Sequence, residues 1–250
     1  MIAIITGASS GIGEEFAKQI DKFSYDEIWL IARRKEKLEK IKENLTTRAK
    51  ILALDLLDDK SFEIFQKTLE KEKPEIDILV NSAGFGVNNF FKDTCLRENA
   101  DMIRLNDLAL TKITYLALDY MKENSAIINI ASVAAFLPQP KFAIYAASKS
   151  YVLSFSKALN RELRDKKINV CTLCPNPVET EFFKNFDRKE EKSIKSLGLE
   201  NLSKMVEKTL RFCKKRDLIT SHPLARLILI AGKIFPHSFI MRIEKKIKMY

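Results

Sequence analysis

Histidine is scarce in this 250-residue chain, which has only His222 and His237, both near the C-terminus. Because a Ser-His-Asp hydrolase needs a histidine beside its nucleophile, this scarcity argues against such an enzyme. Cysteine is also infrequent: the four stand at positions 95, 171, 174 and 213. Only Cys171 and Cys174 are close together, with no histidine near them, so no zinc site is indicated. We expect no bound metal, and reduced, buried thiols.

Long apolar runs are absent as well. The longest uncharged apolar run of the tail, Leu227 to Gly232, is far shorter than the roughly 20 residues of a membrane-spanning helix. The N-terminus leads directly into Ile2-Ala-Ile-Ile5 and a glycine turn, which leaves no room for a signal peptide. We therefore expect a cytoplasmic protein. A hydrophobic content of 46% predicts one globular domain with a sizeable core.

The spacing of apolar residues predicts alternating strands and helices. Runs of strand length lie at Ile2–Ile5, Ile28–Ala32, Ile51–Leu54, Ile76–Val80, Ile127–Ile130, Ile168–Leu173 and, more weakly, Leu218–Thr220. Helical spacing marks Glu14–Asp21, Lys35–Leu45, Phe62–Glu72, Ala100–Lys122 and Ala143–Leu163. This order predicts an α/β fold, a doubly wound Rossmann-type parallel sheet of about seven strands that binds ligands at the carboxyl ends of its strands. We place the domain at residues 1–221, including a substrate lid at about 178–200, and a basic amphipathic helical extension at 222–250.

A glycine-rich turn follows the first predicted strand. In Thr6-Gly-Ala-Ser-Ser-Gly-Ile-Gly13, glycines permit close approach of the backbone to a pyrophosphate, whose charge the next helix N-terminus meets. The spacing differs from the commonest dinucleotide fingerprint, G-x-G-x-x-G. Arg33 and Arg34 stand about 20 residues further on, where an NAD site has a carboxylate. We therefore predict NADP(H), with Arg33 the better placed for the 2′-phosphate. The alternative is a solvated helix start, which suits Lys35 onward.

Tyr145 and Lys149 indicate acid–base chemistry. The two residues are four apart, so they share a helix face, and the ammonium can lower the pKa of the phenol. Ser132 stands thirteen residues upstream. One such pair arises easily by chance, so its meaning depends on the surrounding motifs.

Taken together, residues 2 to about 183 resemble the short-chain dehydrogenase/reductase family. The resemblance is carried by the glycine loop Thr6–Gly13, by Asp55 at the family's adenine-contacting acid, by Asn81-Ser-Ala-Gly84, by Asn106, Ser132, Tyr145 and Lys149 as the catalytic tetrad, and by Pro175-Asn-Pro-Val-Glu-Thr180. Two positions depart from the family pattern. Ser82 replaces an asparagine, and Asn176 replaces a glycine. Because asparagine accepts a left-handed backbone, we expect the turn at Asn176 to survive.

The resemblance implies hydride transfer between NADP(H) and a carbonyl or alcohol. Tyr145 would be the general acid in reduction, Lys149 would hold the nicotinamide ribose, Ser132 would bond the substrate oxygen and Asn106 would anchor a relay water. The residues expected at the cofactor are Gly7, Ser9, Ser10, Gly11, Ile12, Gly13, Arg33, Arg34, Asp55, Leu56, Asn81, Ala83, Gly84, Tyr145, Lys149, Pro175, Val178 and Thr180. For Asp55 and Thr180 the alternative is a helix cap. The resemblance also implies a homodimer or homotetramer. The alternative function is a dinucleotide-binding regulator without turnover.

Phenylalanines gather in three segments that follow predicted strand ends. They are Phe85, Phe90 and Phe91; Phe136 and Phe142; and Phe182, Phe183 and Phe186. Because ligands bind at these ends, one hypothesis is an apolar pocket for a bulky hydrophobic carbonyl or alcohol. Ordinary packing is the alternative. The charged segment 185–198 is expected to form a mobile lid over the substrate.

Positive charge is concentrated at the C-terminus. Residues 211–250 contain ten Lys or Arg against Asp217 and Glu244, a net +8 of the chain's +10. Such a basic amphipathic segment suits an anionic membrane surface. Packing on the sheet domain or on a partner subunit is the alternative that we favour. No nucleic-acid-binding module accompanies the charge, so we expect no nucleic-acid partner.

Overall fold

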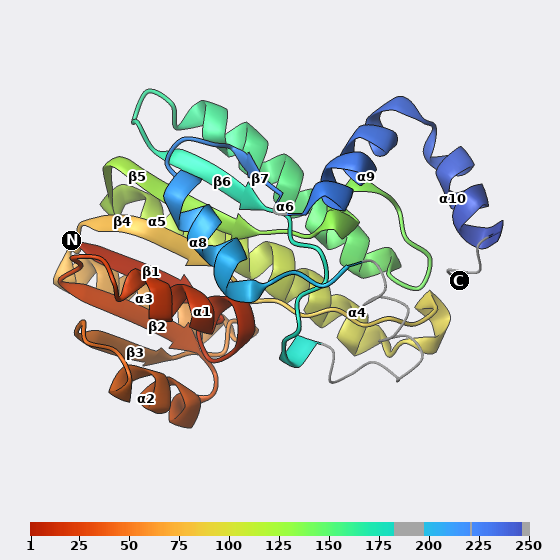
Figure 1. Ribbon diagram of the computed structural model, residues 1–250. Helices are drawn as coiled ribbons and strands as arrows, with labels where there is room; N and C mark the ends of the chain where they lie inside the picture. The colour runs from red at the N-terminus through yellow and green to blue at the C-terminus, as the bar shows by residue number, and fades with distance from the viewer. Residues whose placement is uncertain (183–197, 221, 247–250) are drawn as a thin grey trace.

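The computed structural model describes residues 1–182, 198–220 and 222–246, and it shows a seven-stranded parallel sheet (Figure 1). The strands are β1 Ile2–Thr6, β2 Glu27–Ala32, β3 Ala49–Ala53, β4 Ile76–Asn81, β5 Met121–Ile130, β6 Asn169–Leu173 and β7 Leu218–Ile219. Their order is β3-β2-β1-β4-β5-β6-β7. All seven predicted strands and the doubly wound fold are thereby confirmed. The chain changes direction across the sheet between β1 and β4, the position where such folds bind ligands.

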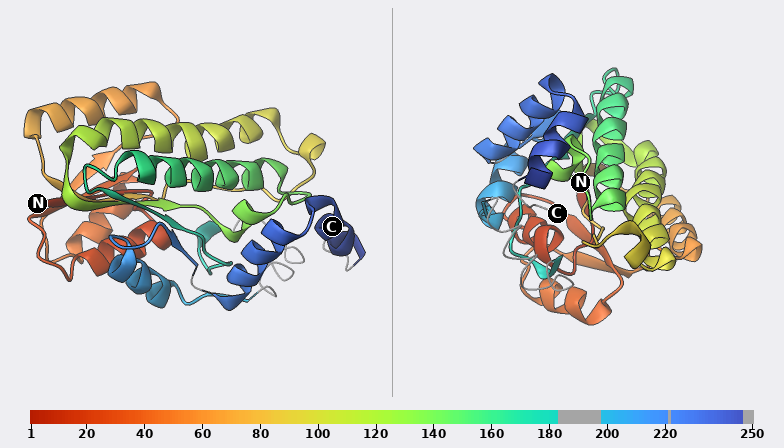
Figure 2. Two further views of the ribbon diagram at one scale, coloured as in Figure 1. Left: turned by 90° about the horizontal axis from the view of Figure 1, so that it is seen from above. Right: turned by 90° about the vertical axis from the view of Figure 1, so that its right-hand side faces the viewer.

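Helices cover both faces of the sheet. The helices of the described residues are α1 Gly11–Ile20, α2 Lys35–Glu43, α3 Asp59–Glu72, α4 Leu96–Ile103, α5 Leu110–Ala117, α6 Ala143–Glu162, α8 Leu202–Phe212, α9 Pro223–Ile234 and α10 His237–Lys246. Figure 2 shows α3, α5 and α6 side by side over one face. Helices α1, α2 and α8 contribute to the core on the other face. The predicted lid at 185–198 falls almost entirely outside the described residues.

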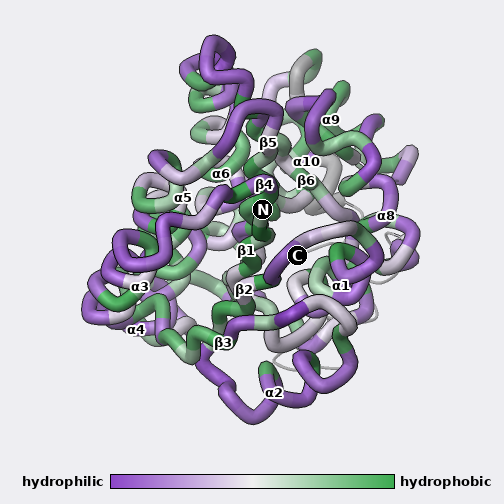
Figure 3. The backbone as a smooth tube through the Cα atoms, turned by 90° about the vertical axis from the view of Figure 1, so that its left-hand side faces the viewer, coloured by the Kyte–Doolittle hydropathy of each residue, from purple (hydrophilic) through white to green (hydrophobic). Residues whose placement is uncertain are grey.

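The core forms because each central strand buries both of its faces. Along β1, Ala3 and Ile5 face one core cluster, and Ile2 and Ile4 face the other. Side chains of a strand alternate between faces, so a strand covered on both sides must be apolar throughout. Figure 3 shows these hydrophobic strands at the centre and hydrophilic segments around them.

The predicted helix Ala100–Lys122 differs from the structure in two ways. A π-helical segment, η2 Arg104–Ala109, separates α4 from α5, and a short 3-10 turn ends at Tyr120. The following strand β5 starts at Met121, well before the predicted Ile127. The first residues of β5 are partly or fully exposed. Because they form no apolar run, the sequence pattern does not reveal them as a strand.

The described part of the tail packs on the domain with one face only. Ala225 is buried, and Ile228, Leu229 and Ile240 contact the core cluster beside η4 Val133–Phe136. The opposite side of α9 exposes Leu227, Ile230 and Ile234, at 63%, 52% and 67% of their surface. Among the described residues, no helix combines the length and the apolar character that crossing a bilayer requires.

A buried chain of polar side chains ties the sheet to α5 and α6. Asn81 Nδ2 donates to Asn129 Oδ1 and to Thr114 Oγ1, both at 2.9 Å. Asn129 Nδ2 in turn donates to Ser156 Oγ at 2.9 Å. All of these residues are buried. A buried polar group without a hydrogen-bond partner is destabilising, so these hydrogen bonds fix how the ends of β4 and β5 pack against α5 and α6.

Replacing the middle member of this chain should cost stability. We expect Asn129→Ala to lower the free energy of unfolding by about 2–3 kcal/mol, because Asn81 and Ser156 each lose a partner in a buried site. The matched control is Asn44→Ala, whose exposed amide bonds only to the carbonyl of Lys40 and should cost at most about 0.5 kcal/mol. Urea unfolding measures both values. Equal free energies of unfolding for the two variants would show that these buried hydrogen bonds do not stabilise the fold.

Candidate active site

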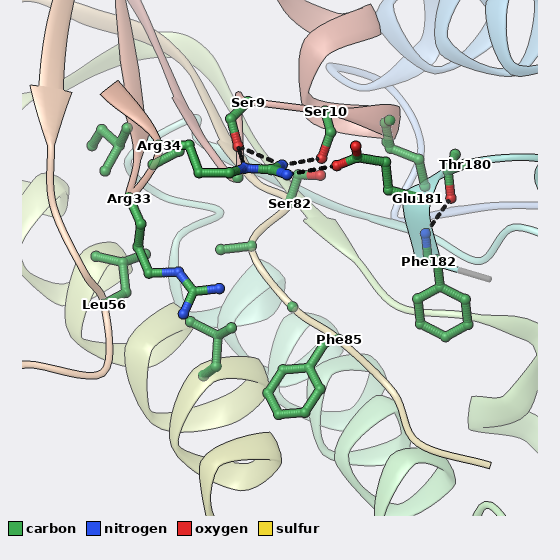
Figure 4. Close-up of a pocket in the computed structure, with 18 of the residues that line it drawn as sticks. Ser9, Ser10, Arg33, Arg34, Leu56, Ser82, Phe85, Thr180, Glu181 and Phe182 are labelled. Atoms are coloured by element: carbon green, nitrogen blue, oxygen red, sulfur yellow. Dashed lines mark hydrogen bonds and ion pairs between the residues drawn. The ribbon is translucent and has the colours of Figure 1, made fainter. Parts of the chain in front are cut away.

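Glycines and polar side chains gather at the carboxyl edge of the sheet, around the switch between β1 and β4 (Figure 4). They surround a cavity of about 410 Å³. The predicted cofactor residues that line it are Gly7, Ser9, Ser10, Gly11, Ile12, Arg33, Arg34, Asp55, Leu56, Ala83, Gly84 and Thr180. The structure therefore brings most of the predicted cofactor residues together at one cavity.

The glycine loop is shaped by two close backbone contacts. Gly7 has a φ of 65°, and a Cβ placed on it would lie 2.7 Å from the backbone nitrogen of Ala83. A Cβ on Gly13 would lie 2.4 Å from the carbonyl oxygen of Gly7. Neither neighbour is a flexible side chain, so only glycine fits at both positions. The first turn of α1 thereby lies directly against the loop, where its free N–H groups suit an anion.

Arg34 is held at the top of the cavity by two hydroxyls. Its guanidinium donates to Ser9 Oγ at 3.0 and 3.2 Å and to Ser10 Oγ at 2.8 Å. Ser10 is the N-cap residue of α1, yet its side chain makes no cap hydrogen bond. Arg34 also pairs with Glu181 at 2.7 Å.

Arg33 extends separately, on the side of Leu56 (Figure 4). It lines the cavity and makes no hydrogen bond or ion pair with any described residue. Helix α2 begins at Lys35, in agreement with the predicted helix start. Both arginines are therefore cavity residues, and Arg34 is the one bound to the serine hydroxyls.

The helix-cap alternative for Asp55 is wrong. The N-cap of α3 is Asp58, whose carboxylate accepts a hydrogen bond from the backbone N–H of Lys60. Asp55 lies at the cavity and accepts from the N–H of Leu57 at 3.1 Å. For Thr180, the hydroxyl accepts from the N–H of Phe182 at 3.3 Å, so a local capping contact is present beside the cavity.

The four tetrad residues come from three elements that meet at this edge. Ser132 follows β5 and accepts from the N–H of Ala134 at 3.1 Å. Tyr145 and Lys149 lie on α6, with the Lys149 ammonium 5.7 Å from the centre of the Tyr145 ring. Lys149 Nζ donates to the carbonyl of Ile130 at 3.0 Å. The predicted grouping of a phenol, an ammonium and a hydroxyl is therefore present in the structure.

The pKa of Tyr145 is raised and not lowered as predicted. Burial raises the pKa of Tyr145 to about 12, and a hydrogen bond with Ser132 opposes this rise. Burial also lowers the pKa of Lys149 to about 8, against the attraction of the Asp107 carboxylate. The sequence reveals the charge of Lys149 but not the loss of water around both groups, which is the dominant cause here.

Asn106 lies in the π-helical segment η2 and is almost fully buried. Its Oδ1 accepts from the N–H of Phe85 at 3.0 Å, and its Nδ2 donates to the Phe85 carbonyl at 2.9 Å and to Ser148 Oγ at 3.0 Å. The amide thus fixes the backbone after β4 against α6. Irregular helical turns of this type are frequent at functional sites.

Several predicted cofactor residues do not line the cavity. They are Gly13, Asn81, Tyr145, Lys149, Pro175 and Val178. Gly13 and Asn81 act from behind it, through the loop contact and the buried amide chain. Val178 forms an isolated bridge with Glu200, and the carbonyl of Pro175 accepts from the N–H of Val133. Asn176 is buried and has no positive φ, so the left-handed turn considered for it is not used.

The aromatic residues divide between the site and the core. Phe85 and Phe182 line the cavity, and Phe142 and Phe182 each pack on the Tyr145 ring with centroids 5.5 Å apart. Phe136 is buried in the core, and Phe90 and Phe91 are exposed. Phe183 and Phe186 lie outside the described residues. Part of the predicted aromatic pocket is therefore ordinary packing.

Some cavity residues were not predicted from the sequence. They are Ile31, Ala32, Leu54, Ser82, Gly86, Leu105 and Glu181. Most follow or end a strand, so their position along β2, β3 and β4 was an available signal. The sequence gives no such signal for Glu181, because its ion pairs are with Arg34 and Lys37, which are distant in the sequence. Among the described residues, no group of three or more metal-ligating side chains is present.

Comparison with known proteins identifies the class. The family model described as short chain dehydrogenase matches residues 1–191, so the chain belongs to the short-chain dehydrogenase family of oxidoreductases. An uncharacterized oxidoreductase of Staphylococcus epidermidis is 30% identical over 200 residues, 79% of this chain and 86% of that protein. 17-beta-hydroxysteroid dehydrogenase type 3 of Mus musculus is 34% identical over 209 residues, 80% of this chain and 67% of that one. NADP-dependent 3-hydroxy acid dehydrogenase of Schizosaccharomyces pombe is 34% identical over 189 residues, 72% of each chain.

Solved structures agree with this assignment. A short-chain dehydrogenase of Sphingobium yanoikuyae in complex with NADPH has a TM-score of 0.78 and 26% identity, with 96% of this chain and 95% of that one covered. A short-chain dehydrogenase/reductase of Burkholderia phymatum in complex with NAD has a TM-score of 0.82 and 22% identity, with 96% and 94% covered. The second comparison concerns the fold alone.

Adding one methyl group at Gly13 should damage the loop. We expect Gly13→Ala to weaken binding of NADPH and NADH alike by about 5- to 150-fold, because the new Cβ meets the Gly7 carbonyl and overpacking costs about 1–3 kcal/mol. Glu14→Ala, at the next position of α1, is the control and should leave both affinities within about twofold. Fluorescence titration of the two cofactors measures the change. Wild-type affinity in Gly13→Ala would contradict the assignment of the loop.

Proposed function

We propose that this chain is an NADP(H)-dependent oxidoreductase that transfers hydride between the nicotinamide and a carbonyl or alcohol. One observation carries the proposal. The phenol of Tyr145, hydrogen-bonded to Ser132 and close to the ammonium of Lys149, stands beside a cavity whose opposite end has a glycine loop and two arginines. This reaction requires a proton donor and a dinucleotide-binding site next to each other.

The residues present fit a dinucleotide. The N-terminus of α1 suits the pyrophosphate, and Asp55 and Leu56 lie where the adenine would bind. Arg34 with Ser9 and Ser10 would hold the 2′-phosphate, since a guanidinium and hydroxyls together match its oxygens. The NADP-dependent relative and the NADPH complex among the related proteins support this preference over NAD. Lys149 would hold the nicotinamide ribose, and Thr180 the carboxamide.

Proton transfer falls to Tyr145. The cofactor, when bound, supplies or accepts the hydride. Because the pKa of Tyr145 is about 12, the phenol is protonated near neutral pH and is ready to act as a general acid in carbonyl reduction. As the proton leaves, the Lys149 ammonium stabilises the phenolate, and Ser132 bonds the substrate oxygen. Asn106 holds the Phe85 backbone beside Lys149 and would anchor a proton-relaying water there.

The substrate is proposed to be bulky and hydrophobic. Phe142 and Phe182 pack on the Tyr145 ring, and Phe85 and Phe182 add apolar surface to the cavity. A pocket of this kind gains affinity from the apolar area that it removes from water. One of the relatives named above is a hydroxysteroid dehydrogenase, which supports a substrate of this class.

Self-association is proposed through α5 and α6. Leu108 near the end of η2, Tyr115 on α5 and Tyr151 on α6 are exposed large hydrophobic residues, and Tyr115 exposes 78% of its surface. Thr111 and Tyr151 hydrogen-bond across the two helices at 2.8 Å, so the face is continuous. An apolar face of two ordered helices suits a second copy of the chain in a twofold dimer.

Membrane contact is proposed for the exposed side of the tail. Leu227, Ile230 and Ile234 present apolar surface to solvent, in a region from 222 to 250 that contains six Lys or Arg and one acidic residue. Apolar side chains beside positive charge favour the surface of an anionic bilayer. The proposed location is therefore the cytoplasm, with reversible binding to a membrane surface.

Removal of the Tyr145 hydroxyl tests the proposed chemistry. We expect Tyr145→Phe to reduce NADPH oxidation with a panel of bulky ketones by at least roughly 100-fold, the size of a general-acid contribution. Binding of NADPH should change little, because the ring and its packing remain. Tyr120→Phe, just before β5 at the opposite edge of the sheet from the site, is the control and should keep wild-type rates. Equal rates for Tyr145→Phe and wild type would exclude Tyr145 as proton donor and favour a binding protein without turnover.

Introducing negative charge on the exposed apolar side of α9 tests the membrane proposal. We expect wild type to float with vesicles that contain an anionic lipid, and Leu227→Glu/Ile230→Glu to lose at least roughly tenfold in the bound fraction, since buried apolar area and positive charge both contribute to this binding. Neutral vesicles should bind wild type weakly. Ile64→Glu, an exposed position on α3, is the matched control. Wild type that fails to float would leave packing on the domain as the role of α9.

A further inference from the structure

A carboxylate occupies the part of the cavity proposed for the 2′-phosphate. Glu181 Oε2 lies 2.7 Å from Arg34 Nη1, and Glu181 Oε1 lies 2.7 Å from Lys37 Nζ. Each oxygen of this carboxylate thus meets a different cation. Figure 4 shows Glu181 in line with the guanidinium that Ser9 and Ser10 also hold. This cationic site therefore has an anion supplied by the chain itself.

Glu181 also separates two cavities. The larger one, of about 410 Å³, contains the glycine loop, and a smaller one of about 290 Å³ lies toward α8. Both are lined by Ser10, Gly11, Thr180 and Glu181. Arg34 lines the larger cavity and Lys37 the smaller one, so the carboxylate lies between its two cations at the boundary of the two cavities.

The next residue connects this ion pair to the proton donor. Phe182 packs on the Tyr145 ring with centroids 5.5 Å apart and an angle of 49° between the planes. A Cβ on Gly86 would lie 2.8 Å from Tyr145 Cδ2 and 2.9 Å from Phe182 Cζ, so both rings fill the space over this glycine. Glu181 and Phe182 are neighbours in the chain, so a backbone shift at Glu181 would also move the ring that packs on Tyr145.

We propose that Glu181 is a specificity-determining residue, an internal anion that competes with the 2′-phosphate of NADP(H) for Arg34. The inference rests on the proposed function and extends it. A phosphate monoester carries a charge of about −1.5 to −2 at neutral pH and three acceptor oxygens, so it displaces a singly charged carboxylate. The 2′-hydroxyl of NAD(H) has no charge and leaves the pair in place. Only the phosphorylated cofactor then moves Phe182 away from Tyr145.

Neutralising Glu181 tests the competition directly. The variants are Glu181→Gln and, as the matched control, Glu179→Gln, an exposed carboxylate that does not line the larger cavity. The probes are adenosine 2′,5′-bisphosphate and AMP, measured by calorimetry. We expect Glu181→Gln to bind the bisphosphate roughly three- to tenfold more tightly than wild type, as loss of partly exposed ion pairs allows. AMP affinity in Glu181→Gln, and both affinities in Glu179→Gln, should stay within about twofold.

Unchanged or weaker bisphosphate binding by Glu181→Gln would overturn the inference, because it would make Glu181 a support for Arg34 and not a competitor. The outcome is independent of the proposed cofactor preference. A wild-type chain that prefers NADH over NADPH would contradict the proposed function, yet tighter bisphosphate binding by Glu181→Gln would still support the competition. If wild type prefers NADPH and Glu181→Gln does not bind the bisphosphate more tightly, the proposed function is supported and the competition is contradicted.

Hydrogen exchange tests the coupling to Tyr145. The backbone N–H of Phe182 donates to Thr180 Oγ1, so exchange of the peptide that contains it reports this local structure. We expect NADPH to raise exchange of the peptide that ends at Phe182 in wild type, whereas NADH leaves it unchanged. In Glu181→Gln, exchange should already be raised without a cofactor. The same response to NADPH and NADH would overturn the coupling.

Discussion

The parallel pairing of β1 with β4, and of β4 with β5, is the constraint on which the site depends. The register sets Thr6 beside Asn81 and Asn81 beside Asn129, so these three strands reach their carboxyl ends together. The glycine loop, the segment after β4 and Ser132 then leave the sheet at the same edge. Since backbone hydrogen bonds fix this register, the glycine loop and the group of Ser132, Tyr145 and Lys149 are held at one edge of the sheet.

Burial decides the electrostatics of this arrangement. Lys149 and Tyr145 are both removed from water, which lowers the pKa of the ammonium and raises that of the phenol. Burial of the charged form of an ionisable group lowers stability, and pKa shifts of this kind are frequent at functional sites. The family supplies the class of reaction. The arrangement of Ser132, Tyr145 and Lys149 explains how this chain would carry out the proton transfer.

The fold and the position of the site were predictable from the sequence because both depend on local patterns. Strands buried on both faces must be apolar, and ligand residues follow strand ends. Other features depend on contacts between distant segments. The early start of β5 has no apolar pattern, and the π-helical turn at Asn106 has no spacing signal. The pKa of Tyr145 depends on how much water the fold excludes. The pairing of Glu181 with Arg34 and Lys37 joins residues almost 150 positions apart in the chain.

The central claim is that hydride passes between a nicotinamide and a substrate carbon in this site. The most direct test is reduction of a bulky ketone with NADPH in which both hydrogens on C4 of the nicotinamide are deuterium, followed by mass spectrometry of the alcohol. Our account predicts one deuterium at the carbinol carbon of the product and none at exchangeable positions. An alcohol without deuterium, or no alcohol with any ketone of the panel, would contradict it.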